Sequence, residues 1–184
     1  METTQYCRQV LDEINNVFQQ VDNNQCEALA QTLRSTPRIF LTGMGRGSLS
    51  IKAFAMRLMH LGFEVFVVGE TNTPRLHSGD LLLMASCSGE TGTSVHLARK
   101  ARQAGATMAL ITASPHSTLA GMTDMMVYLP AKNIGENKPV TTRQPMSSLF
   151  EQSLLLFGDA LVLQLMETCS VSEADMFARH TNLE

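Results

Sequence analysis

The 184-residue sequence has no tryptophan, no C-x-x-C pair and no run of basic residues. The lack of a Lys/Arg cluster, together with a net charge of −3, argues against nucleic acid as a partner. The five histidines show no metal-ligand spacing, so we expect no metal site. The scattered cysteines favour a reduced, cytoplasmic protein over one built on disulfides. They are Cys7, Cys26, Cys87 and Cys169.

Long apolar segments are also expected to be absent. We predict no segment long and apolar enough to span a membrane, and residues 1–16 lack the apolar core of a signal peptide. The chain is long enough for one domain with a sizeable core, and no repeat or linker divides it. The sequence therefore predicts a single domain over residues 1–184.

Short apolar runs alternate with helical patterns along the middle of the chain. This alternation predicts an α/β fold with a parallel sheet and helices on both faces. Strands are predicted at residues 38–42, 64–68, 80–86, 107–112 and 124–129. Helices are predicted within 3–34 (two helices), 48–60, 88–104, 117–121 (a short one) and 146–180 (a long helix from Ser147 or Ser148, then a short one from Ser172). The α/β core is expected over residues 38–130.

Glycine-rich residues 43–48 lie between the first predicted strand and a helix. Glycine lets the backbone turn sharply and lets a ligand approach the N–H groups, and a helix start favours an anion. A dinucleotide-binding loop would need a third glycine at position 48, where this chain has Ser48. A tight turn without a ligand explains the glycines about equally well, so both interpretations stay open for this loop.

The segment Ser86–Thr91 (SCSGET) follows the third predicted strand and opens the next helix. Its three hydroxyls and the unpaired N–H groups of a helix start suit a phosphate. One hydroxyl would be enough for a helix cap, so three at this spacing favour an anion site. If the strand order is 2-1-3-4-5, this loop and residues 43–48 meet at the switch point where such sheets bind ligands.

Glu151 lies early in the long C-terminal helix, with apolar residues on both sides. An apolar setting favours a carboxyl group that takes up a proton near neutral pH, as a general base must. The helix dipole alone also explains an acidic residue in a first turn. His180, in the C-terminal tail, is by itself an exposed tail histidine, and His60, at a helix end, is expected to be structural.

Four segments give the chain its resemblance to a known family: Lys52–Pro74, Ser86–Thr91, Gln144–Gln152 and Arg179–Glu184. On these segments the whole chain resembles the sugar isomerase (SIS) domain family, and within it the 6-phospho-3-hexuloisomerases. The resemblance implies a doubly wound, flavodoxin-like sheet of five parallel strands in the order 2-1-3-4-5. It implies isomerisation between D-arabino-3-hexulose 6-phosphate and D-fructose 6-phosphate through a cis-enediol, with no metal or organic cofactor. It also implies a homotetramer with active sites near subunit boundaries.

The same resemblance assigns roles to individual residues. It makes Glu151 the catalytic base, and it makes His180 a donor to a sugar oxygen, in its own or a neighbouring subunit's site. The family patterns G-x-G-R-S-G and S-G-S-G-E-T are altered here at Gly47-Ser48 and at Cys87. The expected sugar-phosphate-binding residues are Arg46, Gly47, Ser48, Ser86, Cys87, Ser88, Gly89, Glu90 and Thr91.

Two other functions stay open from the sequence. A different sugar-phosphate isomerase, acting on arabinose 5-phosphate or sedoheptulose 7-phosphate, is disfavoured by Lys52–Pro74 and the C-terminal tail. A non-catalytic sugar-phosphate sensor would usually carry a DNA-binding module, and residues 1–37 offer only two amphipathic helices with few cations. The presence of Glu151 favours an enzyme.

Overall fold

The computed structural model describes residues 2–131 and 142–183. Five parallel strands form one sheet in the order β2-β1-β3-β4-β5, which confirms the expected doubly wound topology. The strands are β1 (Ile39–Gly43), β2 (Val65–Val67), β3 (Leu81–Ser86), β4 (Thr107–Thr112) and β5 (Met125–Tyr128). The central pair β1 and β3 is in register from Ile39 opposite Leu81 to Gly43 opposite Ala85, so the loops that follow these two strands begin at the same edge.

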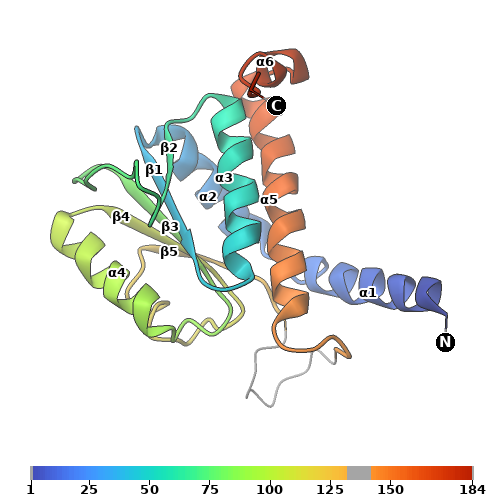
Figure 1. Cartoon of the computed structure of the whole chain (residues 1–184). Helices are drawn as coiled ribbons and strands as arrows, with labels where there is room; N and C mark the ends of the chain where they lie inside the picture. The colour runs from blue at the N-terminus through green and yellow to red at the C-terminus, as the bar shows by residue number, and fades with distance from the viewer. Residues whose placement is uncertain (1, 132–141, 184) are drawn as a thin grey trace.

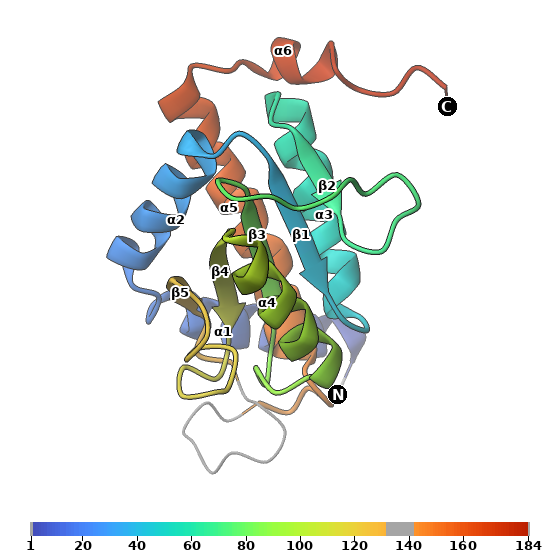
Figure 2. The same ribbon diagram turned by 90° about the vertical axis from the view of Figure 1, so that its left-hand side faces the viewer.

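Helices cover the sheet unequally on its two faces. One face carries α4 (Gly92–Ala104), and the other carries α3 (Gly47–Leu61) and α5 (Ser148–Cys169), with α2 (Asn23–Ser35) beside them. Helix α1 (Thr3–Phe18) projects away from the sheet and packs against α5, with its buried residues in its C-terminal half (Figures 1 and 2). The short α6 (Glu173–Phe177) lies across the C-terminal ends of α3 and α5.

Strand residues are sorted into two hydrophobic clusters because successive side chains of a strand point to opposite faces. Ile39 and Leu41 pack in the cluster under α3 and α5, whereas Phe40 packs in the cluster under α4. Strand β3 repeats this alternation and is buried along its whole length, as expected for a sheet covered on both faces. The larger cluster is therefore the one that α5 closes.

Helix α5 packs closely along α3. Gly158 allows this approach, since a Cβ there would lie 3.2 Å from the ring of Phe54. By length and composition α5 could also cross a membrane, so the expectation that no such segment exists was wrong. Half of its apolar window is buried against the rest of the chain, however, and its buried residues belong to the larger core cluster. We therefore describe α5 as a core helix.

Most helix ends follow the expected signals. Asp22 accepts a hydrogen bond from Asn24 N at 2.8 Å and begins α2, Gly62 ends α3 at φ +98°, and Ser172 caps α6 with Asp175. Two helix predictions were wrong. Residues 117–121 form turns in place of a short helix, and α4 begins at Gly92, so residues 87–91 of the SCSGET segment form a loop between β3 and α4.

Candidate active site

A pocket of about 250 Å³ lies at the carboxyl ends of β1 and β3. The first residue of α3, Gly47, lines it together with the N-cap residues of α4 and α5, Thr91 and Ser147. Figure 2 shows the N-terminal ends of these three helices at the same edge of the sheet. Each helix start carries partial positive charge and N–H groups without a partner in the helix. Three of them around one small pocket favour a bound anion, so we call this space the anion pocket.

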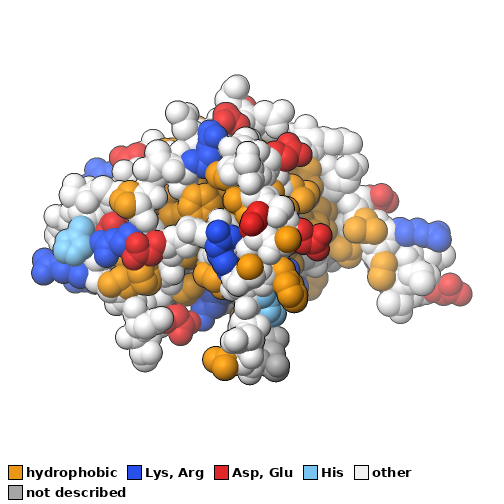
Figure 3. All heavy atoms as spheres, turned by 90° about the horizontal axis from the view of Figure 1, so that it is seen from above, with side chains coloured by type: hydrophobic (Ala, Val, Ile, Leu, Met, Phe, Trp, Pro, Cys, Tyr) orange, Lys and Arg blue, Asp and Glu red, His pale blue; other side chains and the backbone are white. Residues whose placement is uncertain are grey.

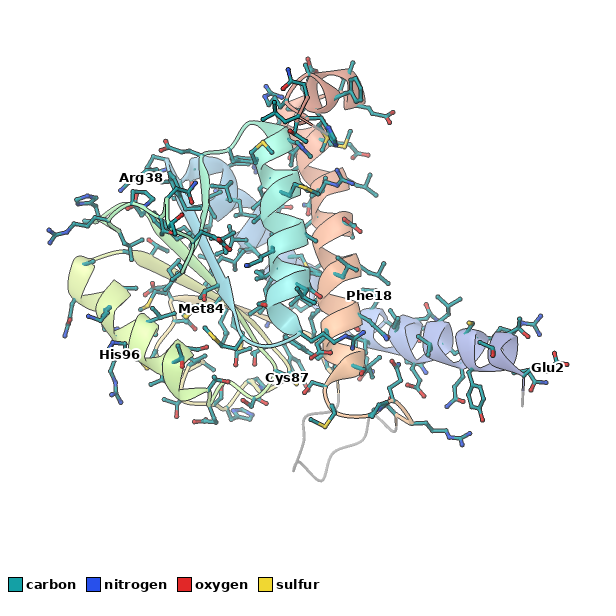
Figure 4. All side chains as sticks on the ribbon, viewed as in Figure 1. Glu2, Phe18, Arg38, Met84, Cys87 and His96 are labelled. Carbon is teal, nitrogen blue, oxygen red and sulfur yellow. The ribbon has the colours of Figure 1, made fainter. Side chains whose placement is uncertain are left out.

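The remaining lining comes from the SCSGET loop and from α5. Figure 4 labels Cys87 at this edge of the sheet, below Met84 of β3. The full set lining the pocket is Met44, Gly47, Ala85, Ser86, Cys87, Ser88, Thr91, Ser147, Phe150 and Glu151. Two larger cavities, of about 480 and 490 Å³, lie elsewhere on the chain, but neither combines converging helix starts with an acidic group, so we assign the chemistry to the smaller pocket.

Glu151 is held at the pocket wall by its neighbours. Its carboxylate accepts a hydrogen bond from Arg46 Nη1 at 2.7 Å, and the Glu151 side chain is only 16% exposed. Arg46 also donates to Ser148 Oγ at 3.1 Å, and Ser50 Oγ donates to the Glu151 carbonyl at 2.8 Å. The setting is thus an ion pair at the edge of an apolar wall formed by Phe150, and not the wholly apolar one expected from the sequence.

Arg46 lies on the far side of Glu151 from the anion pocket. It lines a second hollow of about 300 Å³ together with Leu49 and Leu155, and Glu151 borders both spaces. In this chain Arg46 therefore acts on Glu151 directly, through the ion pair. A role of Arg46 in binding sugar phosphate stays a prediction.

The hydroxyls of the two loops do not all face the pocket. Ser86 and Ser88 line it and also accept hydrogen bonds within their own loop, from Gly89 N at 3.1 Å and Glu90 N at 3.2 Å. Ser48 Oγ instead donates to the Gly45 carbonyl at 2.6 Å and does not line the pocket. The hydroxyl after the third glycine is therefore used inside the first loop.

Gly89 and Glu90 form the outer side of the SCSGET loop. The Glu90 carboxylate accepts hydrogen bonds from Thr118 N and Thr118 Oγ1, both at 2.7 Å, and these bonds lower the pKa of Glu90 below its ordinary value. A Cβ on Gly89 would lie 1.9 Å from Ser117 Oγ. Both residues thus brace the loop against residues 117–118, and neither lines the pocket.

His180 lies at the opposite end of α3 and α5. Its ring stacks on His60 at 5.4 Å between centroids and on Phe177 at 6.1 Å. Arg46 and His60 are 14 residues apart along α3, so roughly 20 Å separates the two ends. The structure does not bring His180 to Glu151 within one chain. His60 is buried, and its pKa is lowered by burial and by the nearby Arg57 and His180.

Four lining residues were missed from the sequence: Met44, Ala85, Ser147 and Phe150. The QPMSSLFEQ segment contains two of them, so the signal for Ser147 and Phe150 was available. No group of three His, Cys, Asp or Glu side chains in residues 2–131 and 142–183 is arranged to hold a metal ion. The chemistry available to the described site is anion binding beside a single carboxylate.

Comparison with known proteins agrees with this geometry. The SIS domain model matches residues 32–156. The 3-hexulose-6-phosphate isomerase of Bacillus subtilis is 42% identical, with 100% of both chains covered, and that of Mycobacterium gastri is 40% identical over 95% of this chain and 88% of its own. A Methanococcus jannaschii structure, from which a 3-hexulose-6-phosphate isomerase function was inferred, has a TM-score of 0.86 at 29% identity, covering 98% of this chain and 99% of its own. The chain belongs to the SIS domain family.

Proposed function

We propose that this chain is a hexulose-phosphate isomerase that interconverts D-arabino-3-hexulose 6-phosphate and D-fructose 6-phosphate. One observation carries the proposal: the Glu151 carboxylate borders a small pocket on which three helix N-termini converge. Full-length similarity to 3-hexulose-6-phosphate isomerases supports the substrate assignment. The pocket volume of about 250 Å³ suits one sugar phosphate and is small for a dinucleotide.

The phosphate would bind at the helix starts and the hydroxyls of Ser86, Ser88 and Thr91, where N–H groups and hydroxyls supply several donors. Glu151 would then remove the proton from C3 of fructose 6-phosphate while O2 gains a proton. The resulting cis-enediol loses its O3 proton and regains a carbon-bound proton at C2, which gives the 3-ketose. Departure and return of one proton need only a single base, which is what the site provides.

We propose that a neighbouring subunit completes the site, within a homotetramer. Large hydrophobic side chains are exposed along the outer faces of α3 and α5, among them Leu49, Met56, Leu155 and Leu163. Viewed along these helices, hydrophobic side chains reach the surface beside charged ones (Figure 3). A two-fold axis across this stripe would place two copies antiparallel. The His180 end of one copy would then lie beside the Glu151 end of the other.

We further propose that the enzyme works in the cytoplasm on a freely diffusing sugar phosphate, without a membrane or nucleic-acid partner. A 3-hexulose 6-phosphate cannot close a five- or six-membered ring, because O6 carries the phosphate and closure through O5 would give a four-membered ring. The substrate is therefore open-chain, and ring opening is required only from fructose 6-phosphate.

Proton exchange at C1 and C3 of fructose 6-phosphate, followed by NMR in deuterated water, tests the proposed function. We expect solvent deuterium at C3, and we expect Glu151→Gln to slow its entry about 10²- to 10⁴-fold, the range of general-base catalysis. Label at C1 alone would indicate an aldose–ketose isomerase. Binding of fructose 6-phosphate without label at either carbon would indicate a sensor.

A further inference from the structure

Glu13 is a buried carboxylate that the mechanism above does not use. It lies on α1, outside the residues matched by the family model, and it is only 8% exposed. In the described part of the chain it takes part in no ion pair. A buried charge of this kind is costly unless hydrogen bonds replace its water.

Four donors surround this carboxylate. Gln9 Nε2 donates from the preceding turn of α1 at 3.0 Å. The other three come from the segment just before α5: Thr142 Oγ1, Arg143 N at 3.2 Å and Gln144 Nε2 at 3.0 Å. Burial acts to raise the pKa of Glu13, but these hydrogen bonds lower it overall. The carboxylate thus ties α1 to residues 142–144 in its charged form.

Residues 142–144 lead directly into the helix that carries Glu151. Between them and α5 lies Met146, whose φ of +57° is a conformation that side-chain-bearing residues rarely adopt. Such a conformation persists only where the surrounding structure holds it. Pro145 O then accepts from Ser148 N at 3.2 Å, and α5 begins. The hydrogen bonds between Glu13 and residues 142–144 therefore hold the segment that leads into α5.

We propose that Glu13 is a positioning residue for the catalytic base. Its carboxylate holds residues 142–144 in place. These residues hold Met146 in its strained conformation at the start of α5, and the position of that start determines where the Glu151 side chain lies relative to the anion pocket. Arg46 and Ser50 hold Glu151 from the α3 side, and Glu13 supports the same helix start from the opposite end of the sequence. This inference rests on the proposed function for the role of Glu151.

The decisive variant is Glu13→Gln, which keeps the size but replaces one acceptor oxygen by an NH₂ group that faces donors. We expect kcat for the isomerisation to fall about tenfold to a hundredfold, because small misplacement of a catalytic group has large effects. KM should stay within threefold, because the anion pocket is built by other residues. The matched control is Asp12→Asn, an exposed neighbour on α1, which should change neither constant.

A rescue variant separates positioning from simple loss of stability. Combining Glu13→Gln with Gln144→Glu returns a carboxylate to the cluster from the other side and restores an amide–carboxylate pair. We expect this double variant to recover at least a third of the lost kcat on a logarithmic scale. Unchanged kcat in Glu13→Gln, with only a lower unfolding midpoint, would overturn the proposal and leave Glu13 as a structural anchor of α1.

Hydrogen–deuterium exchange tests the proposal without activity. Glu13→Gln should raise exchange in peptides covering residues 145–154 and leave those covering α2 unchanged. If the wild-type chain shows no isomerase activity, the proposed function fails, while this measurement still decides whether Glu13 sets the start of α5. Faster exchange confined to α1 would refute the positioning role.

Discussion

The two loops that border the anion pocket are held in different ways. In the first, residues 43–48, a Cβ added at Gly45 or Gly47 would meet nothing within 4 Å. Its long-range polar connection runs forward, from Arg46 to Ser148 and Glu151 on α5. The first loop is thus open around Gly45 and Gly47 and is coupled to the Glu151 carboxylate.

The second loop, residues 86–91, is held by hydrogen bonds from residues at and after the end of β4. The Cys87 carbonyl accepts hydrogen bonds from Thr112 Oγ1 at 3.3 Å and Ser114 Oγ at 3.0 Å, and Glu90 is bound to Thr118. The first loop is thus held by α5, and the second by the residues that follow β4. Changes in the first loop should therefore affect turnover or substrate binding and leave folding largely intact, whereas changes in the second should lower the free energy of unfolding as well as phosphate binding.

The largest expected effect comes from Gly89→Ala. Gly89 has φ +65°, and the new Cβ would overlap the Ser117 side chain. Left-handed backbone and overpacking together should cost about 2–5 kcal/mol of unfolding free energy, and fructose 6-phosphate binding should be lost. Chemical denaturation and calorimetric titration measure the two effects. A variant as stable as wild type would show that the second loop is not braced.

The matched control in the first loop is Gly47→Ala. Gly47 is the first residue of α3, and its backbone has no positive φ. We expect the unfolding free energy to change by less than about 0.5 kcal/mol, while KM rises because the methyl group enters the anion pocket. Equal destabilisation by this variant and by Gly89→Ala would remove the contrast between the loops.

A smaller loss is expected for Arg46→Gln, measured as kcat of the isomerisation. The ion pair that holds Glu151 would be replaced by at most one weak hydrogen bond, so we expect kcat to fall about tenfold to fiftyfold. Arg46→Lys should recover part of the loss, because it keeps the charge but not the second bond to Ser148. A change in KM alone would assign Arg46 to substrate binding instead.

The smallest effect is expected from Glu90, and it depends on pH. Hydrogen bonds from Thr118 lower the pKa of Glu90 below 4.5. The stabilisation is therefore fully present above pH 4.5 and is lost as the pH falls through the lowered folded-state pKa. Glu90→Gln should lower the unfolding midpoint slightly at pH 7, and the gap should close in acid. A gap that does not change with pH would contradict this.

Much of the fold could be predicted because local signals and burial agree along β1, β3 and β4. The predicted strand at 107–112 has the observed bounds of β4, and Gly62 ends α3 as expected. The wrong predictions fall where tertiary contacts determine the local backbone conformation. Residues 117–121 resemble a short helix in isolation, but Leu119 N donates to the Gly89 carbonyl and Thr118 to Glu90, which favours turns over a helix.

The sequence predicted which residues form the two loops of the site better than it predicted which of their groups face the pocket. A sequence shows that Ser48, Gly89 and Glu90 belong to the two loops, but not which way each group points. Nor does it show that Glu13 contacts residues 142–144, since about 130 positions separate them and no local periodicity links them. Such contacts depend on how α1 and α5 pack, which only the folded chain defines.

Because α5 follows all five strands along the chain, the time at which it is synthesised also determines when the core can close. The hydrophobic cluster shared by α1, α2, α3 and the sheet can be buried by α5 only after this helix has left the ribosome. Partly made chains would expose that apolar face, a condition that invites aggregation or chaperone binding. Helix α5 both closes the core and carries Glu151. Burial of the core and assembly of the candidate site should therefore occur together during biosynthesis.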